Sequence, residues 1–187
     1  MSRRGRNNLT QESFYFVTTT ILNFVKVFED EDCCSALISN IKHYQNKYNF
    51  TVLAYVIMPA HFHWIVLTDN KKGTISDIMR DVKKYSAWEI LDILANKEKQ
   101  ELLEHFIEGA KDFPTHKRKL WMHRFDDEVI SPAMAGWVKL NYIHKNPVKA
   151  RLISKEEDYK YSSARNYINQ DHSILFVDTE FVGVEIT

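Results

Sequence analysis

Residues 51–68, with the sequence TVLAYVIMPAHFHWIVLT, form two apolar runs separated by Pro59 and Ala60. Runs of roughly four to eight such residues, bounded by turn residues, are typical of buried strands. The short gap favours an antiparallel hairpin, with one strand over 51–58 and the next over 61–68. This hairpin is the centre of the predicted fold.

Further strands and helices are predicted on both sides of the hairpin. Aromatic and β-branched residues over 14–21 (FYFVTTTI) predict a preceding strand. Apolar residues recur at helical spacing over 35–48 and again from Thr74 to about Ala95, which predicts two amphipathic helices. The stretch 120–130 (LWMHRFDDEVI) is expected to include a short last strand.

A final helix is predicted to begin at Ser131 and Pro132, a suitable N-cap and first residue. It should run to about Lys145, because Pro147 is expected to end it. The order β-α-β-β-α-β-α favours the α+β class. We predict a ferredoxin-like sandwich, in which an antiparallel four-stranded sheet has helices packed on one face, followed by a C-terminal tail.

One main domain is expected from 187 residues of which 44% are apolar. We predict a basic N-terminal tail over 1–12, a main domain over 13–167 and a C-terminal tail over 168–187. A highly charged stretch over 97–119 is predicted to be a helical insertion followed by a loop. Apolar patches in the C-terminal tail, ILFV and FVGVEI, are expected to pack back on the domain.

Charge and composition restrict the class of protein. Zero formal net charge argues against a protein that coats nucleic acid through bulk charge, but it is compatible with a local basic groove. The adjacent Cys33 and Cys34 do not resemble a disulfide framework. No apolar run is long enough to span a bilayer or to act as a secretory signal. We therefore expect a cytoplasmic, nucleoid-associated protein with no membrane partner.

A histidine pair, His61 and His63, opens the second strand of the hairpin. Residues two apart in a strand share a face, so both imidazoles can reach one ion while Phe62 enters the core. Imidazole is a common ligand of divalent metals, and two ligands leave positions open for a phosphate oxygen. With 8 histidines in the chain, chance alone gives about a third of one such pair, so the motif alone is weak.

A tyrosine and an asparagine lie one turn apart on the predicted final helix. Tyr142 and Asn146 are four residues apart and share one helical face. A tyrosine hydroxyl is a competent nucleophile near a metal, and an amide oxygen suits Mg²⁺ or Mn²⁺. Most helical tyrosines simply pack, and Asn before Pro is an ordinary helix terminator, so neither residue is decisive alone.

Four segments together resemble one family. YVIMPAHFHWIVL resembles the histidine–hydrophobic–histidine (HUH) segment of single-tyrosine transposases, and LNYIHKNPVKARLI resembles their tyrosine helix. LWMHRFDDEVI is similar to the block between them, and DYKYSSARNYI to the Tyr-x-x-Ser-Ser close. The resemblance covers roughly Phe14 to Tyr167. Within the family, the sequence is most similar to the branch of REP-associated tyrosine transposases.

This resemblance implies a metal-dependent DNA transposase, an HUH endonuclease that cleaves and rejoins hairpin-flanked single-stranded DNA through a 5′-phosphotyrosine intermediate. Tyr142 would be the nucleophile and His61, His63 and Asn146 the ligands of Mg²⁺ or Mn²⁺. The implied partner is single-stranded DNA with a REP-like or transposon-end hairpin. Whether Tyr142 serves its own histidines or those of a partner in a homodimer is left open.

The sequence departs from the family at three places, one of which is the insertion over 97–119, which is long for the branch and whose role is left open. Ala60 replaces the polar residue that is common before the first histidine, and the acidic cluster Asp126, Asp127 and Glu128 stands where relatives often carry histidines. This cluster either supplies another ligand or is solvated.

Several basic residues are candidate DNA contacts. Four surround the tyrosine helix, three lie near the N-terminus and two lie within the second amphipathic helix. They are, in that order, Lys139, Lys145, Lys149 and Arg151; Arg3, Arg4 and Arg6; and Lys83 and Lys84. The last two groups, like Lys117, Arg118 and Lys119, are equally compatible with solvated surface.

Two other functions are compatible with parts of the sequence. A domesticated relative would bind folded single strands without cutting them, with bases stacked on residues such as Trp64, Tyr85 or Trp88, although core burial is an ordinary role for each. A metal-dependent hydrolase would use the histidine pair with a water nucleophile, which leaves the spacing of Tyr142 and Asn146 unexplained.

Overall fold

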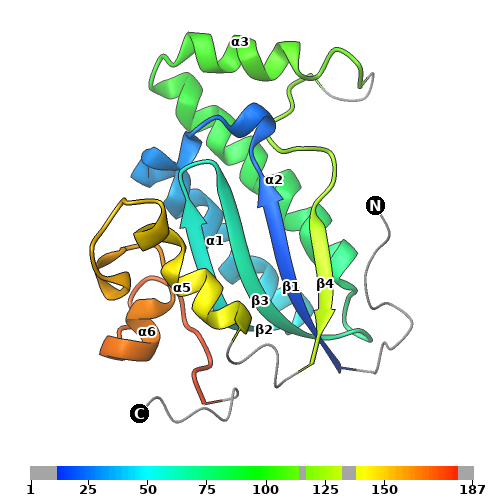
Figure 1. Ribbon diagram of the computed structural model, residues 1–187. Helices are drawn as coiled ribbons and strands as arrows, with labels where there is room; N and C mark the ends of the chain where they lie inside the picture. Colours follow the sequence, from blue (N-terminus) through cyan, green and yellow to red (C-terminus); the bar gives the residue numbers. More distant parts are fainter. Residues whose placement is uncertain (1–11, 114–116, 132–137, 181–187) are drawn as a thin grey trace.

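The computed structural model describes residues 12–113, 117–131 and 138–180 (Figure 1). Arg3, Arg4 and Arg6 lie outside the described residues, as does most of the first half of the predicted final helix. No helix within the described ranges is long and apolar enough to cross a membrane.

The sheet confirms the predicted fold class. Its four strands are antiparallel and stand in the order β2-β3-β1-β4, which is the ferredoxin-like arrangement (Figure 1). The strands are β1 (Glu12–Thr20), β2 (Thr51–Met58), β3 (His61–Asp69) and β4 (Asp126–Ile130). The hairpin of β2 and β3 forms with the bounds that the sequence predicts, to within one residue.

The two long helices begin at good caps. The Asp30 carboxylate accepts a hydrogen bond from the Asp32 amide and starts α1 (Glu31–Tyr48) earlier than the apolar spacing predicted. Thr74 and Asp77 form a capping box at the start of α2 (Ile75–Asn96). The remaining helices and short 3₁₀ turns are η2 (Leu22–Phe24), η3 (Val27–Glu29), α3 (Gln100–Glu108), α5 (Leu140–Lys149), η5 (Glu156–Asp158) and α6 (Ala164–Asn169).

Strand alternation divides the buried side chains between the two faces of the sheet. Val17 of β1 and Phe62 and Trp64 of β3 belong to the main core, where α1 and α2 cover the sheet as predicted. The opposite face is not left bare, because Leu140 and Ile143 of α5 pack there against β2 and β3. Helix α5 therefore lies over the face toward which His61 and His63 project.

The predicted end of the tyrosine helix is wrong. Helix α5 continues through Pro147 to Lys149, and beyond it the Leu152 amide donates to the Pro147 carbonyl at 3.0 Å. A proline has a φ that suits a helix, but it removes the hydrogen bond to the carbonyl four residues earlier and its ring crowds that carbonyl. Burial of the Pro147 side chain helps to offset that loss. The predicted first turn, from Pro132 onward, lies outside the described residues.

The C-terminal segment packs along β2, as the apolar patch ILFV predicted. Leu175 and Val177 are buried, and the Asp178 amide donates to the Val52 carbonyl at 3.0 Å. The second patch, FVGVEI, falls outside the described residues. Helix α3 confirms that the charged stretch over 97–119 contains a helix, and its being an insertion stays a prediction.

Candidate active site

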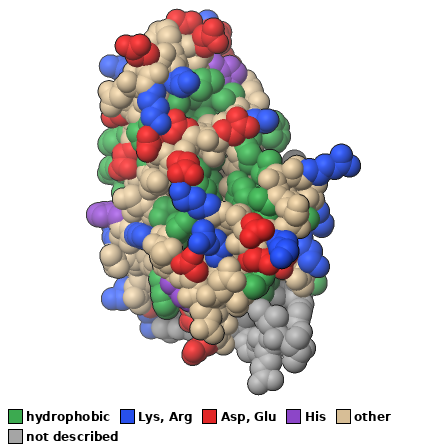
Figure 2. Space-filling model, turned by 90° about the vertical axis from the view of Figure 1, so that its left-hand side faces the viewer, with side chains coloured by type: hydrophobic (Ala, Val, Ile, Leu, Met, Phe, Trp, Pro, Cys, Tyr) green, Lys and Arg blue, Asp and Glu red, His purple; other side chains and the backbone are tan. Residues whose placement is uncertain are grey.

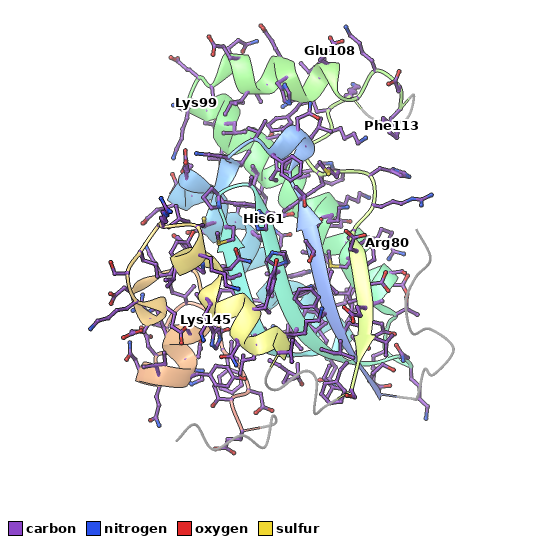
Figure 3. All side chains as sticks on the ribbon, in the orientation of Figure 1. His61, Arg80, Lys99, Glu108, Phe113 and Lys145 are labelled. Carbon is purple, nitrogen blue, oxygen red and sulfur yellow. The ribbon has the colours of Figure 1, made fainter. Side chains whose placement is uncertain are left out.

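The histidine pair lies on one face of β3, as the alternation of a strand predicts. The ring centroids of His61 and His63 are 4.8 Å apart, while Phe62 between them is fully buried in the main core. Figure 3 shows His61 over the middle of the sheet, near α5. The two imidazoles are therefore close enough to bind a single ion.

The surroundings of His63 leave one of its ring nitrogens available. Its Nδ1 lies 2.7 Å from the Thr18 hydroxyl, on the directly opposite residue of β1. The ring of Phe16 stacks on the imidazole, with centroids 5.7 Å apart and planes 14° apart. Nε2 is buried and has no hydrogen-bond partner among the described residues. An unpartnered buried nitrogen is costly unless something binds it.

Burial also keeps both histidines in the form that binds metals. It lowers the pKa of His63 to about 3, with smaller contributions from the neighbouring His61 and Lys139. Burial likewise lowers the pKa of His61. Because metal ligation requires a neutral imidazole, these environments suit a divalent cation.

Helix α5 places Tyr142 beside this pair. The Tyr142 and His63 rings meet edge to face with centroids 5.2 Å apart, and Phe16 lies 5.9 Å from the same tyrosine. Tyr142 is 42% exposed, so a substrate can reach it from solvent. Two segments that are distant in sequence thus bring a phenol and two imidazoles together.

Asn146 lies one turn further along α5 and is half-buried. No described contact joins it to either histidine. The described residues also contain no cluster of three or more His, Cys, Asp or Glu side chains that could hold a metal. The histidine pair fits a divalent cation, whose further ligands would be oxygens from Asn146, water or a DNA phosphate.

Residues 13–146 match the family of transposases described as IS200-like. The chain belongs to this family. Its fold is similar to that of a REP-associated tyrosine transposase solved bound to a REP hairpin, with a TM-score of 0.66, 19% identity and coverage of 96% of this chain and 93% of the other. A putative transposase from Deinococcus radiodurans R1 matches with a TM-score of 0.46, 16% identity and coverage of 76% and 95%. Comparison with curated proteins gave no match.

The chain is therefore a DNA transposase of the HUH single-tyrosine kind, the enzyme class that the sequence predicted. Sequence reasoning missed two contributors to the site of this transposase and left the role of a third, Glu128, open. Thr18 and Phe16 come from β1, and Glu128 of β4 pairs with Lys139 at 2.7 Å. The strand register places Thr18 opposite His63 and Phe16 between Ile65 and Glu128, and it is a long-range property without a local signal. Of the acidic cluster, Glu128 is thus engaged by a lysine.

The predicted DNA contacts separate into two groups. Lys145 and Lys149 are exposed on α5, and the Lys149 ammonium lies 6.0 Å from the Tyr142 ring centroid. Arg151 follows the helix and is exposed as well. Lys139 is less available, because its ammonium pairs with Glu128 and lies 4.4 Å from the Phe16 ring centroid.

Lys83 and Lys84 are not near the histidines, because α2 covers the other face of the sheet. Lys83 is half-buried: its ammonium donates to the Met122 carbonyl at 2.9 Å, and burial lowers its pKa to about 8, so a DNA contact by Lys83 stays a prediction. The surface over α1, α5 and α6 mixes basic and acidic side chains, as the zero net charge predicts (Figure 2).

Proposed function

We propose that this transposase cleaves and rejoins single-stranded DNA through a covalent 5′-phosphotyrosine at Tyr142, at a divalent metal ion bound by His61 and His63. One observation carries the proposal: the exposed Tyr142 ring lies 5.2 Å from the ring of His63, whose buried Nε2 has no partner among the described residues. A nucleophile beside a metal-binding nitrogen is the arrangement that metal-assisted transesterification needs.

The side chains around the proposed metal site have distinct roles. His61 and His63 would hold Mg²⁺ or Mn²⁺, and Asn146 is the proposed third ligand. In this arrangement the Thr18 hydroxyl would accept a hydrogen bond from the Nδ1–H of His63, which leaves Nε2 free to ligate. When bound, a divalent cation polarises the scissile phosphate and neutralises the charge that develops on it.

The reaction conserves the number of phosphate ester bonds. The Tyr142 oxygen loses its proton and forms a bond to phosphorus, while the bond from phosphorus to the 3′-oxygen breaks and that oxygen takes up a proton. The products are a 5′-phosphotyrosine on the downstream strand and a free 3′-hydroxyl on the upstream strand. Attack by another 3′-hydroxyl on the phosphotyrosine reverses these steps, so rejoining needs no external energy source.

The proposed substrate carries a hairpin beside the cleavage site. The solved relative of similar fold is bound to a REP hairpin, and the present chain has exposed cations around its tyrosine helix. Lys145, Lys149 and Arg151 are proposed to contact phosphates and to orient the strand, since such contacts fix register rather than sequence.

The test uses a hairpin oligonucleotide labelled at its 3′ end, incubated with Mn²⁺ and analysed on a denaturing gel. The wild-type protein should form a covalent adduct that EDTA prevents, and Tyr142→Phe should form none. Tyr85→Phe is the matched control, because Tyr85 is 37% exposed, compared with 42% for Tyr142, and lies on the opposite face of the sheet.

Each outcome discriminates between functions. An adduct formed by Tyr142→Phe would show that another residue is the nucleophile. Cleavage without any adduct, unchanged in Tyr142→Phe, would indicate a hydrolase with a water nucleophile. Hairpin binding without cleavage in any divalent metal would indicate a non-cutting binding protein.

A further inference from the structure

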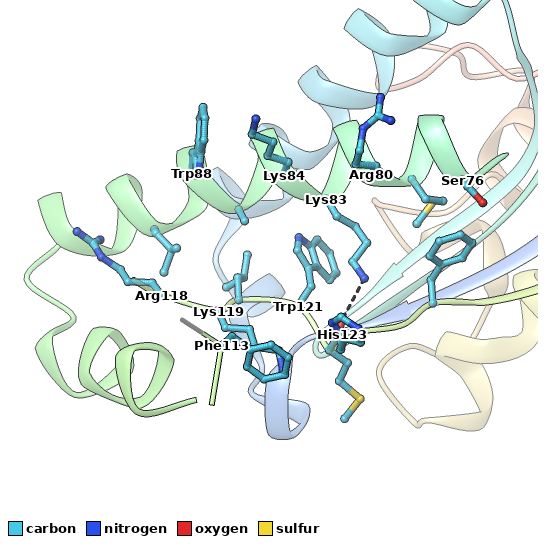
Figure 4. Close-up of a pocket in the computed structure, with 16 residues that line it drawn as sticks. Ser76, Arg80, Lys83, Lys84, Trp88, Phe113, Arg118, Lys119, Trp121 and His123 are labelled. Carbon is cyan, nitrogen blue, oxygen red and sulfur yellow. Dashed lines mark hydrogen bonds between the residues drawn. The ribbon is translucent and has the colours of Figure 1, made fainter. Parts of the chain in front are cut away.

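A groove lies between α2 and the segment that leads from residue 117 to β4, with a volume of about 550 Å³ (Figure 4). Its floor includes Met79, Leu91 and Trp121, which belong to the main core between the sheet and its two long helices. His61 and His63 project from the opposite face of β3. We call this cavity the α2 groove, and it is separate from the candidate active site.

The α2 groove is lined by cations and by no acidic side chain among the described residues. Its basic side chains are Arg80, Lys83, Lys84, Arg118 and Lys119. The charge of Arg80 is offset by Asp77 and Asp81. Lys84 and Arg118, in contrast, are exposed and have no carboxylate partner within the described part of the chain. The groove thus presents net positive charge in a protein whose total charge is zero.

Aromatic rings alternate with these cations. Trp88 is 55% exposed on the rim, and the Lys84 ammonium lies 4.9 Å from its ring centroid. Across the groove, Lys119 lies 3.4 Å from the ring centroid of Phe113. On the floor, the buried indole nitrogen of Trp121 has no hydrogen-bond partner among the described residues. The rim of the groove thus presents an exposed aromatic ring face and a positive charge side by side.

Cations interleaved with exposed aromatic rings suit a polyanion that has open ring faces. Phosphates would contact Lys84 and Arg118, and bases would stack on Trp88. Base faces are hidden in a duplex, so stacking of this kind selects unpaired nucleotides. We propose that the α2 groove binds a short stretch of unpaired DNA, as a second contact separate from the active site. This inference rests on the proposed function in one respect, the single-stranded DNA substrate.

Binding of a fluorescent dT12 oligonucleotide, measured by anisotropy in EDTA, tests the groove without cleavage. The variant Lys84→Glu/Arg118→Glu should bind at least about tenfold more weakly than wild type. The slope of log affinity against log salt should fall by roughly 1.4, because two phosphate contacts are lost. The matched control Lys42→Glu/Lys155→Glu makes the same change in net charge at exposed sites outside the groove, and should bind within about twofold of wild type.

A second variant tests stacking without a change of charge. Trp88→Ala should weaken dT12 binding by about tenfold and abolish the quenching of tryptophan fluorescence by the oligonucleotide. Binding of dT12 by both groove variants as tightly as by wild type would overturn the inference. Equal losses in the groove and control variants would also overturn it, as would an equal loss for a 12-base-pair duplex.

The outcomes separate this inference from the proposed function. Tyr142→Phe retains the α2 groove and should bind dT12 normally while forming no adduct. If Tyr142→Phe still forms an adduct while the groove variants lose binding, only the nucleophile assignment fails. If the adduct behaves as expected and the groove variants bind normally, only the groove inference fails.

Discussion

The two ring nitrogens of His63 have different environments. Nδ1 lies 2.7 Å from the Thr18 hydroxyl, whereas Nε2 is buried without a partner among the described residues. In metal sites, a partner of this kind fixes the tautomer and the orientation of the ligating ring. Thr18 is therefore expected to act through His63 rather than on the substrate.

Substitution of Thr18 by Val should weaken Mn²⁺ binding by about 10- to 100-fold, because the His63 ring loses the contact that orients it. The affinity is measured by electron paramagnetic resonance of free Mn²⁺ during titration, so the result does not depend on catalysis. Thr20→Val is the control, since Thr20 lies two residues along β1 on the same face, opposite His61. Equal Mn²⁺ affinity in wild type and Thr18→Val would contradict this role.

For single residues, the sequence predicts those positions that depend only on neighbouring residues in the chain. The alternation of a strand places His61 and His63 on one face and Phe62 in the core, and this is confirmed. The contact of Thr18 with His63 spans 45 residues and depends on the register of β1 against β3. No local pattern encodes that register, so Thr18 could not be identified beforehand.

Helix α5 is attached to the sheet by polar contacts as well as by apolar packing. His144, two residues after Tyr142, is buried and lies 2.8 Å from the Ser163 hydroxyl, which also accepts from the Tyr55 amide of β2. The Tyr167 hydroxyl donates to the Leu53 carbonyl of β2. This arrangement connects the helix that carries Tyr142 to β2, an edge strand of the sheet, through the segment that carries α6.

Loss of this anchor should destabilise the protein and displace Tyr142. His144→Ala should lower the free energy of unfolding by about 1–3 kcal/mol, because Ser163 loses a buried partner. It should also slow adduct formation while leaving dT12 binding at the α2 groove unchanged. Urea unfolding measures the first effect, with Lys145→Ala on the exposed side of α5 as a control that should stay within about 0.5 kcal/mol.

An unchanged rate of adduct formation in a folded His144→Ala protein would show that α5 is held by apolar packing alone.

The boundaries of helices, like single contacts, can be predicted from the sequence only where they depend on neighbouring residues. The capped starts of α1 and α2 follow from Asp30 and Thr74. The continuation of α5 through Pro147 depends on burial against the sheet, which the residue type does not reveal.

The whole molecule uses both faces of its sheet. The candidate active site lies under α5 on one face, and the α2 groove lies on the face covered by α1 and α2. These two helices are joined by a buried carboxylate. Asp81 of α2 accepts from Tyr48 at 2.7 Å and from Lys47 at 2.9 Å, both on α1, and from Arg80 at 2.8 Å.

Asp81 should make the stability of the domain depend on pH in the acid range. The pKa of Asp81 is lowered by hydrogen bonds from Arg80, Tyr48 and Lys47, which outweigh the effect of burial. Because its folded pKa lies below the unfolded value, its stabilisation is present above the unfolded pKa and is lost as pH falls through the folded pKa. Asp81→Asn should cost about 1–3 kcal/mol at pH 7.

The loss caused by Asp81→Asn should shrink as pH falls from about 5 toward 3. Urea unfolding across this range measures the change, and Asp92→Asn on the exposed side of α2 should give a curve parallel to wild type. A loss that is the same at pH 7 and pH 3 would contradict a charged role for Asp81.

At the scale of the molecule, periodicity and turn residues were enough to predict the ferredoxin-like sheet and the order of its strands and helices along the chain. They could not predict that a helix would also cover the second face, because the packing of α5 depends on which strands lie beneath it. Nor could they identify the α2 groove, in which Trp88 and Arg118 are brought together from distant segments.

Mass spectrometry of the trapped adduct shows directly whether the Tyr142 oxygen becomes bonded to DNA. After reaction with a hairpin oligonucleotide in Mn²⁺, the protein is digested with protease and nuclease and its peptides are sequenced. The peptide containing Tyr142 should carry the nucleotide mass, attached through the 5′-phosphate. Attachment to any other residue, or cleavage with no modified peptide, would contradict this role of Tyr142.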